Sequence, residues 1–439
     1  MYALLLFLLV LVRVFSSSAP EPYAFIGEFR SREGIPLVRQ WFREHHFLLH
    51  ENVQIEWSKG IHVRLNGSLP VESEVVRSPS SFLIPPWLPK RKHKQTLLSF
   101  DDKERLVVRL LYELQKGETS KWFGYFKMLP KAGELATFPI FWDVDVHMTY
   151  PELRGTFFSS ALQIKIDKVH KFYNKLVRSR ILNERPGFDI VKWAVAMVDS
   201  RSFRISKKKG THRLNDRPFL APLADLLNHN RHAKVGWKLG YVGSSTKQKK
   251  KTFFRIFSIG GLDFLRGGED VEVYNTYNTA TSSTDFLLHY GFVPKPSSET
   301  DYLPLELSLP REDGLYSDRE MLRQLLNVST SARFYYGKPF PTQLLKLVCI
   351  INLRAEDLRD VLQAKHTLTK FQHHEDETRP HNMELLKKTL RGLKRSGSTK
   401  THEGVGSSIR EIVGLENSII DHHIEEIDKL QQQVELREL

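Results

Sequence analysis

The sequence predicts an α+β fold, in which a β-rich region is interrupted by helices and followed by an all-α C-terminal third. Within 233–260, apolar and polar residues alternate on both sides of a Ser/Lys-rich turn, a pattern typical of a β-hairpin. Apolar residues between Leu106 and Leu114 instead recur at helical spacing. After Pro296 the chain changes character, and helices are expected at 318–327, 341–353, 355–366 and 382–393.

Composition bounds the architecture and excludes some classes of site. A chain of 439 residues with 41% hydrophobic content can bury more than one core, so two or three domains are expected. A single cysteine, Cys349, excludes an intrachain disulfide and a cysteine-rich zinc module. Adjacent histidines such as His45 and His46 point to different faces of a helix or strand, which disfavours shared metal ligation. We therefore expect no metal site.

Three sequence blocks carry the candidate chemistry. They read Ala-Pro-Leu-Ala-Asp-Leu-Leu-Asn-His-Asn at 221–230, Gly-Gly-Glu-Asp-Val-Glu-Val-Tyr-Asn-Thr-Tyr at 267–277, and Leu-Leu-His-Tyr-Gly-Phe-Val at 287–293. The polar turn Asn228-His229 follows an apolar run and can place an amide and an imidazole beside buried backbone, where such groups hydrogen-bond an adenosine and an amino-acid-like moiety. A tyrosine hydroxyl at the neck of such a pocket can orient a nucleophile.

These blocks resemble the C-terminal half of a SET domain, of the type found in the Rubisco large-subunit lysine methyltransferase and the actin histidine methyltransferase. The resemblance implies an S-adenosyl-L-methionine-dependent protein N-methyltransferase that acts on a lysine side chain. A histidine target is one alternative, and a catalytically inactive SET scaffold that binds a protein partner is another. Methyl transfer from a sulfonium to a nitrogen lone pair requires a target that is neutral, aligned and dry.

Tyr277 is the candidate catalytic residue. Counting back from the third block places it where the family carries its active-site tyrosine, whereas counting forward from Gly268-Glu269 falls nearer Tyr274 and Asn275. We favour the backward count. The alternation of Val271 and Val273 also permits a simpler interpretation, in which Tyr277 is an ordinary half-buried tyrosine of a β-strand.

The resemblance assigns cofactor binding to several segments. Asn228 and His229 would hold S-adenosyl-L-methionine, and Tyr290 and Phe292 would wall the cofactor or target channel. Arg201, which follows the helix expected at 188–200, would border the pocket. A solvated helix-end arginine, favourably placed against the helix dipole, is an equal alternative for this residue.

The N-terminal part of the resemblance departs from the family pattern. Relatives begin the SET fold with a Gly-x-Gly turn that lets the backbone approach the cofactor, and the segment 57–64 keeps one glycine, Gly60. Gly60 and Ile61 are the candidate cofactor contacts of this segment. His62 stands in the place of the second glycine, where its imidazole would crowd the methionine end of the cofactor and favour the inactive scaffold.

The inferred organisation has a leader at 1–19, a SET domain at 24–297 with a helical insert at about 100–215, and a helical substrate-binding-like domain at 298–439. The insert includes helices expected at 163–177 and 188–200. Apolar residues at helical spacing from Ile409 to Val434 mark an amphipathic helix, which is expected to pack within the chain. We expect a monomer.

The leader contains an uninterrupted apolar run, Leu4–Val12, at the start of the chain. This run is shorter than the roughly 20 residues of a membrane span and suits the core of a signal peptide. Entry into the secretory pathway is therefore expected, with the cytoplasm or nucleus, as for the family, as the alternative. Membrane contact is expected only through this segment.

The formal net charge is +14, and much of it lies in the basic clusters 90–94, 207–209 and 247–251. Such clusters can bind phosphates, but solvated loop charge is the more common explanation, so nucleic-acid binding is not the favoured expectation. A basic enzyme gains no long-range attraction toward basic histone tails. The expected partner is a non-histone protein substrate.

Overall fold

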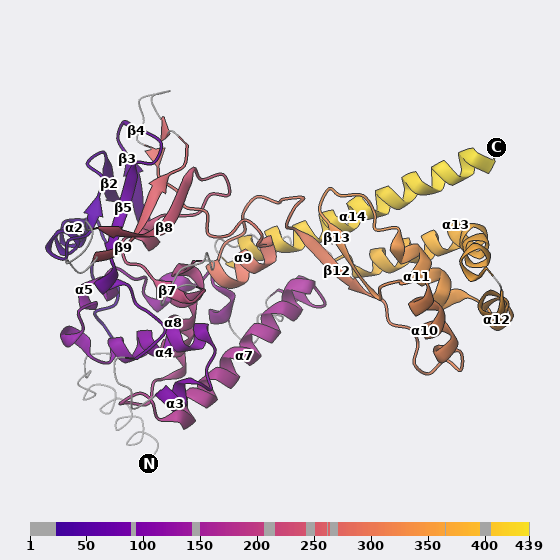
Figure 1. Cartoon of the computed structure of the whole chain (residues 1–439), viewed down its shortest axis with the longest axis horizontal. Coiled ribbons are helices and arrows are strands. Elements are labelled where there is room, and N and C mark those ends of the chain that lie inside the picture. Colours follow the sequence, from indigo (N-terminus) through magenta and orange to yellow (C-terminus); the bar gives the residue numbers. More distant parts are fainter. Residues whose placement is uncertain are drawn as a thin grey trace, which may run out of the picture. The chain divides into compact units, whose positions relative to one another are not determined.

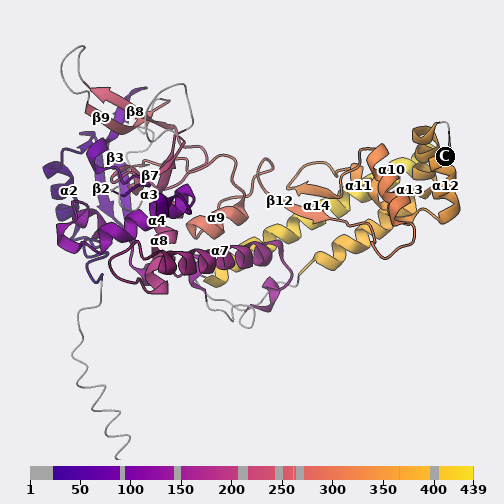
Figure 2. The same cartoon turned by 60° about the horizontal axis from the view of Figure 1, so that its bottom comes forward.

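The structure is a computed structural model that describes residues 23–88, 94–142, 150–205, 216–242, 251–260, 262–263, 271–364, 366–395 and 405–438 (Figure 1, Figure 2). The chain forms two compact units. The first contains the described residues up to Leu135 together with Val169–Asn278, and the second contains Ala136–Lys168 and Thr279–Leu439. The expected leader, the glycines of the second motif block and nearly all of the three basic clusters lie outside the described residues.

The first unit is built around sheets whose strands come from distant parts of the sequence. One sheet has four strands in the order β1-β5-β9-β8, and another has three in the order β11-β3-β2. Figure 1 shows the indigo strand β5 beside the pink strand β9, with which it pairs. The bounds are β1 Leu48–Leu49, β2 Val53–Trp57, β3 Ile61–Leu65, β5 Glu74–Pro79, β8 Val235–Val242, β9 Lys251–Ser258 and β11 Val271–Glu272.

The expected hairpin at 233–260 is confirmed. Strands β8 and β9 pair antiparallel, with Trp237 opposite Ile256 and Leu239 opposite Phe254. Phe254 and Ile256 are fully buried, so the alternation that predicts the hairpin also directs one face of it into the core. Two shorter pairs complete the strands of this unit: β4 Ser68–Leu69 with β10 Leu262–Asp263, and β6 Ser202–Arg204 with β7 Pro218–Leu220.

Helices in the first unit agree with the expected insert. Helix α4 begins with a capping box, in which the Asp101 carboxylate accepts from the Glu104 N–H at 2.8 Å and the Glu104 carboxylate accepts from the Asp101 N–H at 2.9 Å. Its apolar stripe is buried, as predicted. Helix α7 starts in the second unit and ends in the first. The bounds are α2 Ile35–Glu44, α3 Lys94–Leu97, α4 Asp102–Leu114, α5 Phe123–Phe126, α7 Phe157–Ser179 and α8 Phe188–Arg201.

The second unit is helical, as expected, but it also contains a two-stranded sheet that the all-α prediction misses. Strand β12 (Tyr302–Glu306) pairs antiparallel with β13 (Ser331–Tyr335), and α14 lies beside both strands in each view (Figure 1, Figure 2). The predicted amphipathic helix is confirmed, because Ile412 and Ile419 of α14 are buried in the core of this unit. Its helices are α9 Ser283–Tyr290, α10 Tyr316–Leu325, α11 Gln343–Asn352, α12 Ala355–Gln363, α13 Thr367–Leu393 and α14 Val405–Glu438.

The helix expected at 382–393 is longer than predicted. Helix α13 begins at Thr367 and continues through Pro380, where the sequence indicated a helix boundary. An interior proline costs about 3 kcal/mol. Phe371 before the proline and Met383 after it are both buried, so tertiary packing on either side holds one continuous helix.

The division into units also differs from the predicted domains. The first unit ends at Asn278 rather than at 297, and the second unit takes in Ala136–Lys168, which the sequence assigns to the insert. Among the described residues, no helix is both long enough and apolar enough to cross a membrane.

Candidate cofactor and methyl-transfer site

A strained turn presents the Asn228-His229 pair. The preceding residues from Ala221 to Leu227 are all buried, and Leu223 has φ +74° and ψ −49° ahead of a short 3₁₀ turn. A left-handed φ is costly for a leucine, so packing and hydrogen bonds must hold it. The Ser78 hydroxyl of β5 donates to the Pro222 carbonyl at 2.7 Å. Asn228 and His229 then emerge half-buried at the end of this fixed segment.

Backbone hydrogen bonds join this turn to the second motif block. His229 and Asn275 form an isolated parallel bridge. The Asn275 N–H donates to the Asn228 carbonyl at 2.7 Å, and the Asn230 N–H donates to the Asn275 carbonyl at 3.0 Å. Residues that are 45 to 47 positions apart in the sequence therefore lie side by side, as the predicted site requires.

His229 and Tyr277 contact each other directly. The Tyr277 backbone N–H donates to His229 Nδ1 at 3.1 Å, and the two ring centroids are 5.1 Å apart. Because Nδ1 accepts this bond, the neutral ring carries its proton on Nε2. Burial, together with the charge of Arg231, lowers the pKa of His229 from 6.5 to about 4. The imidazole is therefore uncharged at neutral pH.

The Tyr277 hydroxyl faces the start of the polar turn. It donates to the Leu227 carbonyl at 3.0 Å, so its oxygen keeps lone pairs that can accept from a target nitrogen. Strand β11 ends at Glu272, and Tyr277 lies in a bend beyond the Asn275 bridge. The interpretation of Tyr277 as an ordinary strand tyrosine is therefore wrong.

The departure from the Gly-x-Gly pattern lies next to Asn228. The Asn228 side-chain amide donates to Glu272 Oε1 at 2.6 Å and lies 3.5 Å from His62 Nδ1. Both ring nitrogens of His62 have a partner. Nδ1 lies 3.1 Å from Glu272 Oε2, and Nε2 lies 2.7 Å from the Ser58 carbonyl. The imidazole at this position thus lies next to the candidate cofactor residue Asn228. Whether it crowds the methionine end of the cofactor stays a prediction.

Gly60 and Ile61 have different surroundings within the β2–β3 hairpin. The Ile61 side chain is buried in the core, so only the Ile61 backbone could contact a cofactor. A Cβ atom at Gly60 would come no closer than 3.9 Å to another group, His62 Nε2. Within the described part of the chain, no contact therefore requires glycine at position 60. A cofactor role for Gly60 and Ile61 stays a prediction.

Arg201 is not a solvated helix-end residue, so that alternative is wrong. Its guanidinium donates to the Asp225 carbonyl at 3.0 Å and lies 3.5 Å from Asp225 Oδ2, which also accepts from the Tyr125 hydroxyl at 2.6 Å. Burial raises the pKa of Asp225, and the Arg201 charge opposes that rise. Arg201 therefore supports the turn before Asn228 from inside. A contact of Arg201 with the cofactor stays a prediction.

Sequence reasoning assigned no role to Tyr125, Asp225 or Glu272. Asp225 carried a signal, because an acid inside a buried apolar run needs a partner. Tyr125 follows the helix predicted from Leu106 to Leu114 and carried no such signal. Its neighbour Gly124 is required by the space around it. A Cβ there would come within 2.3 Å of the Trp41 ring. No feature of the sequence around Glu272 indicated that this residue would take part in the site.

Tyr290 and Phe292 lie in the second unit, around the end of α9. Gly291 between them has φ +78°, and a Cβ there would come within 2.6 Å of the Phe138 ring, so both conformation and space require glycine. The rings of Tyr290 and Phe292 pack on Phe286 at 5.2 and 5.5 Å between centroids. Their role as channel walls stays a prediction.

No cluster of three or more His, Cys, Asp or Glu side chains suited to a metal ion occurs in the part of the chain that the structure describes. The histidine pairs His373-His374 and His422-His423 lie on helices α13 and α14. His423 is fully buried, and burial lowers its pKa to about 4.

Two curated proteins of similar sequence are named as lysine methyltransferases. The chain is 26% identical over 263 residues to the chloroplastic fructose-bisphosphate aldolase lysine N-methyltransferase of Arabidopsis thaliana, a match that covers 57% of this chain and 49% of that protein. It is 28% identical over 238 residues to the N-lysine methyltransferase setd6 of Xenopus laevis, covering 51% and 48%. The chain thus spans about half the length of the curated relatives it matches. No family model matches it.

Solved structures of the same type share the fold. The SET domain of LSMT bound to lysine and AdoHcy matches with a TM-score of 0.70 at 16% identity, covering 91% of this chain and 92% of that chain. Rubisco LSMT bound to AdoMet matches with a TM-score of 0.68 and the same coverage. The resemblance read from the motifs is confirmed: the chain has the fold of the Rubisco LSMT structures and is similar in sequence to lysine methyltransferases.

Proposed function

We propose that the chain is an S-adenosyl-L-methionine-dependent protein methyltransferase that acts on a lysine side chain. One observation carries the proposal: the polar turn Asn228-His229 and the Tyr277 hydroxyl converge beside the Leu227 carbonyl. The similarity to curated lysine methyltransferases supports the choice of lysine over histidine.

The residues of this site fit the proposed cofactor. Asn228 and His229 offer an amide and a neutral imidazole, and the uncharged ring adds no repulsion toward a sulfonium. Asn275, only 3% exposed, has a buried side-chain oxygen without a partner among the described residues, which suits a ligand donor. S-adenosyl-L-methionine would supply the methyl group. Asn228, His229 and the Gly60-Ile61 backbone would hold it, with Arg201 at the border.

Tyr277 would orient the target nitrogen. Its hydroxyl proton is committed to the Leu227 carbonyl, so the oxygen can only accept from an approaching amine. The contact with His229 and the bond to its Nδ1 fix the position of the residue. A fixed hydroxyl can align the lone pair of the target nitrogen with the methyl group, in addition to binding the target.

Replacement of Tyr277 tests the proposal. We expect Tyr277→Phe to reduce turnover at least about 100-fold, while S-adenosyl-L-methionine affinity measured by calorimetry stays nearly unchanged. Turnover is measured as transfer of an isotopically labelled methyl group to proteins of a lysate that lacks this enzyme. Tyr112→Phe, on α4 and remote in sequence from the motifs, is the matched control. Equal turnover in Tyr277→Phe would remove that residue from the mechanism, and loss in Tyr274→Phe instead would favour the forward count.

A catalytically inactive scaffold is the second candidate, and the contact of His62 with Asn228 favours it. If the imidazole blocks the cofactor, the wild-type chain fails to bind S-adenosyl-L-methionine and His62→Gly gains binding. The methyltransferase proposal expects the wild type to bind and His62→Gly to change the affinity less than about tenfold.

The proposed substrate is a non-histone protein, and the helical region at 298–439 would bind it. The basic charge of the chain supports this choice, as does the aldolase in the name of one relative. Mass spectrometry of the labelled lysate would identify the methylated residue. Labelling concentrated on histones would contradict the proposal.

We also propose that residues 1–19 direct a monomeric chain into the secretory pathway, on the strength of the apolar run Leu4–Val12. N-terminal sequencing of the protein expressed in its host tests the cleavage, and sedimentation tests the monomer. An uncleaved chain in the cytoplasm or nucleus would favour the alternative location.

A further inference from the structure

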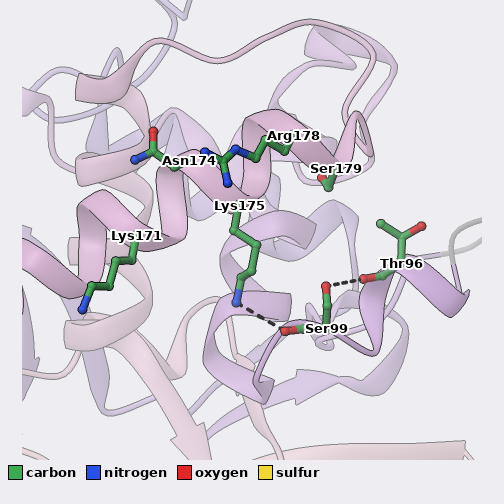
Figure 3. Close-up of a pocket in the computed structure, with 7 residues that line it drawn as sticks. All are labelled: Thr96, Ser99, Lys171, Asn174, Lys175, Arg178 and Ser179. Carbon is green, nitrogen blue, oxygen red and sulfur yellow. Dashed lines mark hydrogen bonds between the residues drawn. The ribbon is translucent and has the colours of Figure 1, made fainter.

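A polar groove lies between α3 and the last turns of α7 in the first unit. Its cavity measures about 460 Å³ and is lined by polar and charged side chains alone. Figure 3 shows Thr96 and Ser99 on one side. The other side is formed by residues of α7: Lys171, Asn174, Lys175, Arg178 and Ser179. The groove shares no residue with the candidate methyl-transfer site.

The groove carries excess positive charge. Lys171 and Arg178 are exposed and have no hydrogen-bond or ion-pair partner among the described residues. Lys175 is partly neutralised, because it contacts the Glu104 carboxylate and also donates to the Ser99 carbonyl at 3.3 Å. Figure 3 shows Lys175 reaching across the groove, with Lys171 and Arg178 on either side of it along the helix. Two cations therefore remain for a ligand.

The arrangement of these cations is linear. Lys171, Lys175 and Arg178 follow one another at i, i+4 and i+7 on one face of α7, so the outer two are separated by about 10 Å along the helix axis. A row of charges suits a chain of anionic groups better than a single compact anion. Asn174 and Thr96 add neutral hydrogen-bond donors to the row.

The chemistry of the lining favours phosphates over an acidic peptide. Lysine, arginine, serine, threonine and asparagine side chains are the usual contacts of nucleic-acid phosphates. A bound peptide would also bury apolar anchors, and none of the described lining residues offers a large apolar side chain for that purpose. In the sequence, the basic run 90–94 immediately precedes this part of the chain; its first four residues lie outside the described residues and form no part of the proposed site.

We propose that this groove binds the phosphodiester backbone of a nucleic acid without reading its sequence. Lys171 and Arg178 contact successive phosphates, and Lys175, Asn174 and Thr96 contribute further contacts. The sequence predicted that the basic clusters are solvated loop charge. This groove differs from those clusters, because its cations lie on helix α7 and line one cavity.

Salt-dependent binding of the full chain to a fluorescein-labelled single-stranded RNA of mixed sequence tests this proposal. We expect Lys171→Gln/Arg178→Gln to weaken binding about tenfold and to reduce the slope of log K against log salt by about 1.4, since each phosphate contact on a single strand contributes about 0.7. The matched control is Lys370→Gln/Lys388→Gln, which removes the same charge from exposed positions of α13. It should leave the slope within about 0.3 of the wild type.

The proposal would be overturned by equal loss of affinity in the groove and control variants, by displacement of the RNA by poly-L-glutamate at equal charge concentration, or by wild-type binding that does not respond to salt. The double variant removes only exposed side chains, so an unchanged melting temperature is expected and confirms that any loss of binding is local. Discrimination between RNA sequences would also contradict a backbone-only contact.

Discussion

The two sides of the candidate site are held in different ways. We call 221–229 with 275–277 the motif wall and 57–62 the hairpin wall. The motif wall is fixed from inside by the buried contacts of Arg201, Asp225 and Tyr125. The hairpin wall is fixed at its edge by half-buried groups, where His62 Nδ1 lies 3.1 Å from Glu272 Oε2. Buried polar contacts tolerate little change, so the recognisable motifs lie on the first wall and the departure from the family pattern lies on the second.

The largest expected effect follows from removing Asp225 behind the motif wall. Asp225→Ala leaves the Arg201 guanidinium without its carboxylate and the Tyr125 hydroxyl without its acceptor. Breaking a buried pair from one side costs about 3–5 kcal/mol, so urea unfolding should show a loss of about that size. Asp189→Ala removes an exposed partner of Lys192 and should cost less than about 1 kcal/mol. Equal losses of unfolding free energy in Asp225→Ala and Asp189→Ala would show that the buried contacts of Asp225 do not stabilise the motif wall.

The next effect concerns Glu272, which connects the two walls. Glu272→Ala removes the acceptor of the Asn228 amide and of His62. We expect S-adenosyl-L-methionine affinity to fall about tenfold in calorimetry, because the orientation of Asn228 is no longer fixed. Glu56→Ala serves as the control, because it removes a carboxylate that lies opposite His62 in the hairpin but pairs with the exposed side of Arg64. Unchanged S-adenosyl-L-methionine affinity in Glu272→Ala would mean that Asn228 binds the cofactor without the hydrogen bond to Glu272, or does not bind it.

A further effect, on stability at acid pH, is expected from the protonation of His229. Its pKa is lowered from 6.5 to about 4 in the folded chain, so the unfolded chain binds a proton first as the pH falls. The contribution to stability is complete above pH 6.5 and is lost between 6.5 and 4. We expect His229→Asn to remove up to about 2 kcal/mol of this acid-induced decline in the free energy of unfolding. His232→Asn, at an exposed histidine, should leave the decline unchanged.

The smallest effect lies at the tip of the hairpin wall. Lys59 is exposed and has φ +56°, a conformation that costs a non-glycine residue about 1 kcal/mol. Lys59→Gly should therefore raise the free energy of unfolding by about 1 kcal/mol, measured in urea. Lys59→Ala keeps the strain and should give no gain. A gain in both variants would point to the lysine side chain instead of the backbone.

Local patterns predicted much of the fold. Alternation predicted the β8–β9 hairpin, and helical spacing predicted α4 and α14. The motif blocks predicted a shared site, in which the structure joins Asn228 to Asn275 and His229 to Tyr277. These features depend on residues that are neighbours in sequence or on blocks with a distinctive chemistry.

Long-range partners could not be predicted in the same way. The pairing of β12 with β13 joins strands 25 residues apart with weak patterns, and α13 passes through Pro380 because of burial on both sides. Glu272 gained its role from a strand register that places it beside Arg64 and near Asn228. The partner of Arg201 is likewise set by tertiary packing, so both interpretations of that residue were open from sequence.

Calorimetric titration of S-adenosyl-L-methionine into the wild-type chain and Asn228→Ala tests the central claim most directly, since Asn228 belongs to the motif wall and lies 3.5 Å from His62 of the hairpin wall. We predict one binding site per wild-type chain and an affinity at least about tenfold weaker in Asn228→Ala. Equal affinities, or no heat of binding in either protein at millimolar ligand, would contradict the assignment of this site.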